Sequence, residues 1–157
     1  MRRSLSAVIL SALIIVLPGL TLAAPFAYIT QPAVDTVSVI DTATDTVTTT
    51  VAVGDTPRGV AVVPDGTRVY VTNFIDDTVS VIDTATNTET TTVNVGARPE
   101  GVAVSPDGAW AYVANRNDGT VTVVDTATDT VATTIGVGTS PEGGGRLPGR
   151  ISGLCDE

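Results

Sequence analysis

The chain has 157 residues, a formal net charge of −9, and neither histidine nor lysine. A single domain is expected at this length, and so acidic a chain is poorly matched to a phosphate backbone, which argues against nucleic acid as a partner. The lack of histidine removes the commonest general base and metal ligand. Valine and threonine dominate while aromatic residues make up only 4%, and this composition favours pleated strands over helices.

Residues 1–23 have the layout of a secretory signal peptide. Two arginines follow the first residue, an apolar run extends to Leu17, and small residues follow up to Ala24. The pattern predicts cleavage after Ala23 or Ala24, no membrane span after cleavage, and a secreted, periplasmic or cell-surface location. The alternative is an uncleaved membrane anchor, for which the apolar core is short.

A repeat of 42 residues organises the rest of the chain. The segment Val79-Ser-Val-Ile-Asp83 has the same sequence as the segment that starts at Val37, and a close copy starts at Val121. Glycines and prolines keep the same spacing without insertions: Gly54, Gly96 and Gly138, and Pro57, Pro99 and Pro141. A constant repeat length near 40 residues, with each repeat composed of strand-like segments, is typical of β-propeller blades.

One repeat unit reads as four short strands separated by turn residues. An apolar stretch forms the inner strand, Pro64-Asp65-Gly66 forms a hairpin turn, and alternating threonine and valine form an outer strand with threonine toward water. The predicted strands of this unit are residues 59–63, 69–72, 79–82 and 90–95. The predicted fold is therefore an all-β propeller fragment of four-stranded blades: three strands in 27–53, complete blades in 59–95 and 101–137, and a ring that is not closed.

Several linked motifs resemble the YVTN β-propeller repeat proteins, a surface-layer-like family. The matching segments are Tyr70-Val-Thr-Asn73, Tyr112-Val-Ala-Asn115 and the run from Gly101 to Gly108. The resemblance covers residues 27–143 and implies an architecture rather than a ligand. Many propellers close their ring when the C-terminal end supplies a strand that the first blade lacks, and the first blade here starts with its second strand.

The repeat breaks after Gly143, and residues 144–157 have a different, glycine-rich composition. Possible codons for this tail, read one nucleotide later, can encode Val-Ala-Val-Ser-Pro-Asp-Gly and then a Tyr-Val-Thr strand, in register with the repeat. The sequence therefore predicts a frameshifted tail in which Cys155 has no selected role. The alternative is a genuine glycine-rich terminus.

The recurring acidic positions are interpreted as turn residues, because each follows a strand and can bond its own backbone. They are Asp41, Asp83 and Asp125; Asp65 and Asp107; and Asp45, Asn87 and Asp129. No nucleophile has a partner base, and no haem or metal motif occurs. We therefore assign no catalytic, cofactor-binding or metal-ligating residues, and predict no cofactor and no enzymatic activity.

The loops that lead into inner strands and those between second and third strands are predicted to share one face around the channel mouth. The charged residues Arg58, Arg98, Glu100 and Glu142 are expected just before inner strands, and residues 73–77 and 115–119 form the second set of loops. Their sequences differ between repeats, and variable loops on a rigid scaffold are common binding sites. The predicted partner is an unidentified protein or small ligand.

Together these features predict a secreted or cell-surface propeller scaffold for binding. The alternatives are a fragment of a lactonase-type or redox-type propeller enzyme whose active-site residues lie in other blades, and a structural element of an envelope layer. An open stack of blades leaves apolar faces and strand edges without neighbours. We therefore expect the chain by itself to self-associate or aggregate and to bind nothing specifically.

Overall fold

The computed structural model describes residues 26–143, which form three antiparallel sheets and contain no helix. The first blade is β1-β2-β3, the second β4-β5-β6-β7 and the third β8-β9-β10-β11. The strands are β1 (Phe26–Gln31), β2 (Thr36–Asp41), β3 (Thr46–Ala52), β4 (Pro57–Val62), β5 (Arg68–Asn73), β6 (Thr78–Asp83), β7 (Thr88–Asn94), β8 (Pro99–Val104), β9 (Trp110–Asn115), β10 (Thr120–Asp125) and β11 (Thr130–Gly136). The predicted signal peptide and the predicted frameshifted tail lie outside the described residues.

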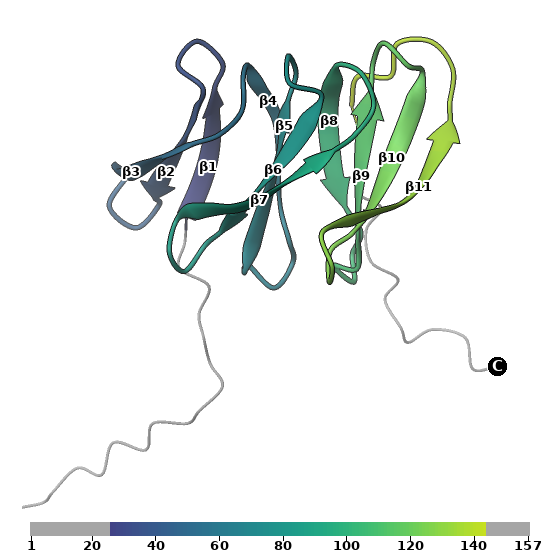
Figure 1. Cartoon of the computed structure of the whole chain (residues 1–157). Helices are drawn as coiled ribbons and strands as arrows, with labels where there is room; N and C mark the ends of the chain where they lie inside the picture. Colours follow the sequence, from purple (N-terminus) through teal and green to yellow (C-terminus); the bar gives the residue numbers. More distant parts are fainter. Residues whose placement is uncertain (1–25, 144–157) are drawn as a thin grey trace, which may run out of the picture.

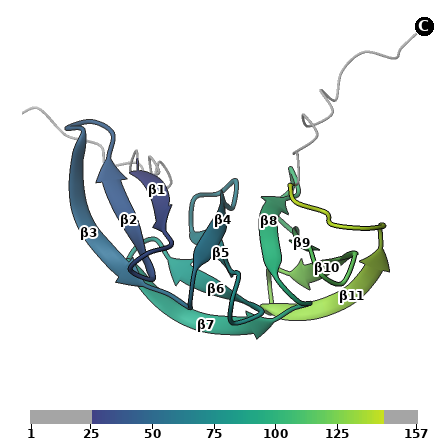
Figure 2. The same cartoon turned by 90° about the horizontal axis from the view of Figure 1, so that it is seen from above.

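The three blades stand side by side along an arc (Figures 1 and 2). Seen from above, β1, β4 and β8 lie on the inside of the arc and β3, β7 and β11 on the outside (Figure 2). The arc does not close into a ring over the described residues. The prediction of an open propeller fragment with three strands followed by two complete blades is confirmed.

The second and third blades repeat each other's pairing at an offset of 42 residues. Pro57 pairs with Asn73 and Pro99 with Asn115. In both blades the register then shifts, and regular pairing resumes at Val60–Val71 and Val102–Val113. The outer strands β7 and β11 carry a β-bulge at the same repeat position. It lies opposite the step from Val81 to Ile82 in β6 and the step from Val123 to Val124 in β10. The two complete blades thus have the same strand order and the same register, as expected where the turns and the hydrophobic pattern set the register of each hairpin.

The hydrophobic core lies between blades and not within any one of them. One buried cluster joins the first blade (Tyr28, Val37, Val39, Val51) to the second (Val69, Val71, Ile82). Another joins the second blade (Tyr70, Val79, Val81, Val93) to the third (Val102, Val104, Ala111, Val113, Val124). The front face of a blade is the one turned toward the next blade along the chain, and the back face is the one turned toward the preceding blade. The two clusters bury the front faces of the first and second blades against the back faces of the second and third.

Candidate binding face

Loops and turns gather at the two ends of the blades. The loop face, at the top of Figure 1, holds the linkers between blades and the β1–β2, β5–β6 and β9–β10 loops. The turn face, at the bottom, holds the other hairpin turns. The expectation that both sets of variable loops share one face is confirmed by direct contacts: the amides of Phe74 and Arg116 donate to the carbonyls of Thr56 and Arg98, at 3.1 and 3.0 Å.

Each linker between blades is held by a carboxylate from the blade that precedes it. Thr56, Arg98 and Ser140 occupy one repeat position and all have positive φ, at 56, 57 and 55°. Such backbone is costly for a residue other than glycine and persists only when its surroundings fix it. Asp35 Oδ1 accepts the amide of Thr56 at 2.9 Å, and Asp77 Oδ1 accepts the amide of Arg98 at 2.8 Å. These loop carboxylates therefore have a structural role.

The β5–β6 loop carries an aromatic ring that meets two guanidinium groups. The Cζ atoms of Arg58 and Arg98 lie 3.7 and 5.0 Å from the centroid of Phe74, within the range of cation–π attraction. Arg58 also pairs with Glu100 at 2.5 Å, while Glu100 Oε2 is buried without a hydrogen-bond partner. These contacts fix the orientation of Phe74, and the neighbouring Ile75 is exposed.

Two expectations about these residues were wrong in detail. Arg58 and Glu100 lie within β4 and β8, because these inner strands begin at Pro57 and Pro99, two residues earlier than predicted. Arg98 does precede an inner strand, and Glu142, where no strand is assigned, pairs with Arg116 at 3.5 Å.

Asn73 was predicted to begin the loop of residues 73–77, but it is the last residue of strand β5 and has a structural role. Its side chain is fully buried and donates to Thr78 Oγ1 and Ser80 Oγ, both at 2.9 Å. Asn115 makes the equivalent bonds in the third blade. A Cβ on Gly54 would lie 2.6 Å from Asn73 Nδ2, so the recurring glycine of the linker leaves room for this buried amide. The positive φ falls instead on Asp77.

The recurring acidic residues on the turn face act as the sequence predicted. Asp41, Asp83 and Asp125 each accept a backbone amide two residues later, at 2.7–2.8 Å. The backbone amide of Thr86 lowers the pKa of Asp83 below its ordinary value. Asp65 and Asp107 have lowered pKa values as well, through hydrogen bonds from Thr67 and Ser105 respectively. Asp45, Asn87 and Asp129 all have positive φ, as expected of turn residues.

Asp129 has a second role that the sequence reasoning missed, because it links two blades. It accepts a hydrogen bond from the Tyr70 hydroxyl at 2.5 Å and pairs with Arg68 at 3.1 Å. Burial raises the pKa of Tyr70, and the hydrogen bond to Asp129 raises it further. Tyr28 makes the equivalent contact with Asn87 at 3.4 Å. The sequence did contain a sign of this contact, because the tyrosines and these turn residues both recur every 42 residues.

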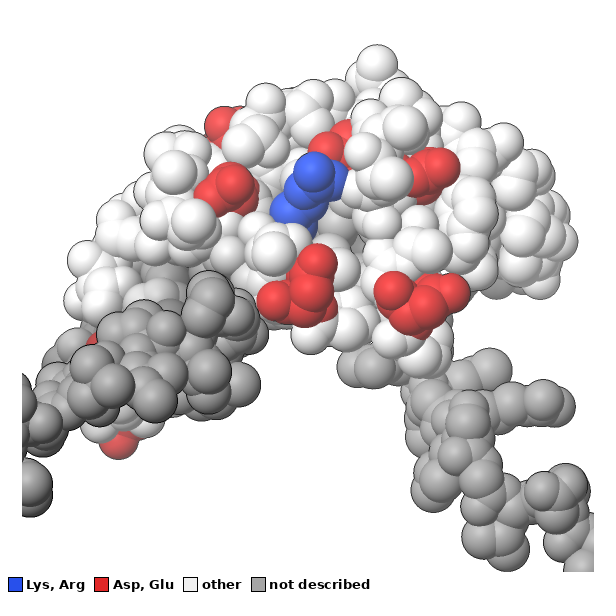
Figure 3. Space-filling view, turned by 90° about the horizontal axis from the view of Figure 1, so that it is seen from below, with Lys and Arg blue, Asp and Glu red and all other residues white. Residues whose placement is uncertain are grey.

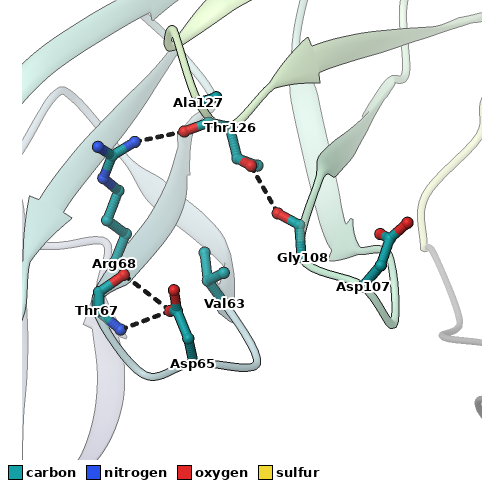
Figure 4. A pocket seen from close by; sticks show the side chains of 8 residues that line it. All are labelled: Val63, Asp65, Thr67, Arg68, Asp107, Gly108, Thr126 and Ala127. Atoms are coloured by element: carbon teal, nitrogen blue, oxygen red, sulfur yellow. Dashed lines mark hydrogen bonds between the residues drawn. The ribbon is translucent and has the colours of Figure 1, made fainter.

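A cleft of about 280 Å³ opens on the turn face between the second and third blades (Figure 4). Arg68 crosses it and donates to the carbonyl of Thr126. Asp65 accepts the amide of Thr67 within its own turn, and the Thr126 hydroxyl donates to the carbonyl of Gly108 in the β8–β9 turn (Figure 4). The face as a whole presents acidic side chains around a basic one (Figure 3). The polar groups of this cleft thus stabilise the contact between blades.

Within residues 26–143, no group of three or more acidic, histidine or cysteine side chains is placed to hold a metal ion. The same part of the chain has no helix long and apolar enough to cross a membrane.

The fold is similar to several solved propellers. One is hydrazine synthase from Kuenenia stuttgartiensis, with 33% identity and a TM-score of 0.73, matched over 76% of this chain and 35% of that one. Dihydro-haem d1 dehydrogenase NirN matches at 20% identity and a TM-score of 0.65, over 75% of this chain and 26% of that one. A protein of unknown function from Desulfotomaculum acetoxidans matches with 23% identity and a TM-score of 0.64, over 74% of this chain and 40% of that one. The chain thus spans well under half the length of these proteins.

No curated protein matches the chain significantly. A family model, described as a YNCE-like β-propeller, matches residues 58–142, which is more than half of the chain. The matched region covers both complete blades, whose inner strands, bulges and turns repeat without a gap. It also agrees with the resemblance to YVTN repeats seen in the sequence. The chain therefore belongs to the YNCE-like β-propeller family.

Proposed function

We propose that this chain is a non-enzymatic, extracytoplasmic propeller scaffold whose loop face binds a protein segment with apolar and basic side chains. The observation that carries the proposal is the β5–β6 loop, where Phe74 and Ile75 replace Arg116 and Asn117 of the third blade on the same backbone. Ile75 and Asn117 both donate their amide to the linker, to Asp55 and Ala97, at 3.3 and 3.2 Å. The scaffold is thus constant while the side chains that it presents change.

The apolar part of the proposed site is pre-organised. Arg58 and Arg98 both make cation–π contacts with the Phe74 ring, and the next residue, Ile75, is exposed. A rigid aromatic group with a neighbouring aliphatic one provides contact area at a small cost in conformational entropy. All of these residues come from two neighbouring blades, so the site does not need a complete ring.

The charged part of the loop face favours a basic partner. Carboxylates outnumber guanidinium groups there: Asp35, Asp55, Asp76, Asp77, Glu100, Asp118 and Glu142 against Arg58, Arg98 and Arg116. Arg58 and Arg116 are already paired with Glu100 and Glu142. An acidic rim attracts positive partners and repels negative ones, and a chain of net charge −9 strengthens this preference.

A peptide array tests the binding proposal. The full-length chain is applied to peptides that combine apolar residues with either basic or acidic ones, at low and high salt. We expect retention on the basic set, loss at high salt, and at least about tenfold weaker binding for Ile75→Asn, which installs the third-blade residue. Val47→Asn removes an exposed apolar side chain from the outer strand β3 and serves as the matched control.

Two results would overturn the proposal. One is equal retention on the acidic and basic sets. The other is no retention at all, which would agree with the expectation from the sequence that the chain alone binds nothing specifically. The proposed location is tested separately by mass spectrometry of the exported protein: an N-terminus at Ala24 or Pro25 is expected, and an intact Met1 would contradict it.

The 33% identity to hydrazine synthase favours a second candidate, a propeller domain of a redox enzyme. Its expectation is a haem or a redox partner bound to the chain. Titration of the full-length chain with haem distinguishes the two functions, because a saturable shift of the Soret band would support the redox candidate over the peptide-binding scaffold.

A further inference from the structure

The front face of the third blade is open, although the equivalent faces of the first two blades are covered. Tyr70 is fully buried in the second blade, whereas Tyr112, at the same repeat position, is 39% exposed. Val93 is 6% exposed and its counterpart Ile135 is 46% exposed. The residues are of the same type, so the third blade has a front face suited to receiving another blade.

The back face of the first blade is open in the complementary way. Ile29 is 50% exposed, but Val71 and Val113 at the same position are fully buried against the preceding blade. Ile40 is partly exposed, while its counterparts Ile82 and Val124 are fully buried. Within the described residues, the chain therefore carries one free front face and one free back face of the kinds that already pack together twice within it.

A hydrogen bond crosses each of the two covered interfaces. The donor and the acceptor for a third such bond lie on the open faces of the third and first blades. Tyr28 bonds Asn87 and Tyr70 bonds Asp129, so the front-face tyrosine of one blade reaches the β-turn residue of the next. Tyr112 is the equivalent tyrosine of the third blade, and the equivalent turn residue of the first blade is Asp45. In a contact with another copy, Tyr112 would therefore meet Asp45 of that copy. Asp45 has φ 53°, close to the 51° of Asn87 and the 53° of Asp129, so its turn has the same shape.

The inner strand position of the first blade can also be filled from a second copy. A Cβ added to Gly59 would lie 2.7 Å from the carbonyl of Glu100 on the next inner strand. A Cβ added to Gly101 would lie 2.6 Å from the carbonyl of Glu142, so Glu142 and Gly143 pack on the third blade as the start of a further inner strand would. Ser140 repeats the positive φ of the other linkers. By analogy with the pairs Pro57–Asn73 and Pro99–Asn115, Pro141 is placed to meet Gln31 of another copy.

We propose that two copies of this chain associate head to tail, with the third blade of each packed on the first blade of the other, to form a closed ring of six blades. The contact is heterologous, because a front face meets a back face, and such contacts close into rings when the rotation allows. Six blades lie within the range of about four to eight that closed propellers use. The proposal concerns assembly, so it does not depend on the proposed peptide binding.

Complementary interface variants of the full-length chain, purified after export, provide the test. Sedimentation velocity of the unaltered chain should show a two-copy species. Ile135→Glu on the front face and Ile29→Glu on the back face should each weaken association at least about tenfold, since a carboxylate is buried without a partner. Mixing the two variants should restore a two-copy species, because one intact front face and one intact back face remain.

Val131→Glu and Val47→Glu are the matched controls. Both positions are exposed and lie on outer strands, and the second blade has glutamate, Glu89, at the same repeat position. We expect these variants to associate as the unaltered chain does. A monomeric unaltered chain, polymers of increasing size, an Ile29→Glu variant that still dimerises alone, or a mixture that stays monomeric would each overturn the proposed ring.

Discussion

The second and third blades have nearly the same sequence pattern, strand order and register, yet their front faces differ in burial. The front face of the second blade is buried against the third, and the front face of the third blade is open. Because the two blades are so alike internally, the difference comes from the neighbour and not from the blade. Each blade stabilises the fold mainly through surfaces that it shares, as in repeat proteins generally.

The largest expected effect comes from truncating the tyrosines that distinguish the two faces. Tyr70→Ala should lower the free energy of unfolding by about 3–5 kcal/mol, because it opens a cavity in the interface and removes the hydroxyl that donates to Asp129. Tyr112→Ala should cost less than about 1 kcal/mol in dilute solution, where copies do not associate. Urea denaturation measures both, and equal losses would contradict the comparison.

Glycines at a covered and at an open position should differ in the same way. A Cβ on Gly59 would lie 2.7 Å from the carbonyl of Glu100 on the next inner strand, whereas nothing lies within 4 Å of one on Gly136. We expect Gly59→Ala to destabilise by about 1–3 kcal/mol through overpacking. Gly136→Ala should be neutral or slightly stabilising in thermal melting, and destabilisation of similar size in both variants would count against the packing argument.

Alkaline pH should weaken the covered interface. The pKa of Tyr70 is raised above its ordinary value of 10.0, first by burial and then by Asp129, so the folded state prefers the neutral phenol. The stability from this preference is complete below pH 10 and is lost as pH rises toward the folded pKa, by up to about 1.4 kcal/mol per pH unit. Denaturation at pH 9 and 11 should show the loss, and Tyr70→Phe should reduce it.

The smallest effect is expected from the charge on Asp129. Asp129→Asn should keep both the turn and the bond from Tyr70, since Asn87 does the same for Tyr28, but it removes the ion pair with Arg68. We expect a loss of about 0.2–1 kcal/mol, as is usual for partly exposed pairs. Asp45→Asn, at the same repeat position in the first blade, should have almost no effect in dilute solution. A double-mutant cycle with Arg68→Ala would show whether the pair accounts for the difference.

The sequence by itself determined the repeat, the strand order, the register and the turns. These features depend on interactions within 42 residues: Asp83 bonds the amide of Ala85, Asp65 bonds that of Thr67, and the alternation of valine and threonine sets the faces of each strand. The loop face was also predicted, because the connection order of a propeller places those loops together.

Only the tertiary structure decided which blade faces are covered, and which side chains meet across blades. Tyr70 and Asp129 are 59 residues apart, and the ring of Phe74 meets Arg58 from β4 and Arg98 from the linker before β8. Such contacts depend on how neighbouring blades pack, which no turn motif encodes. The same valine or tyrosine pattern is therefore compatible with a buried core in one blade and an open face in the next, because burial belongs to the pair of blades and not to either sequence alone.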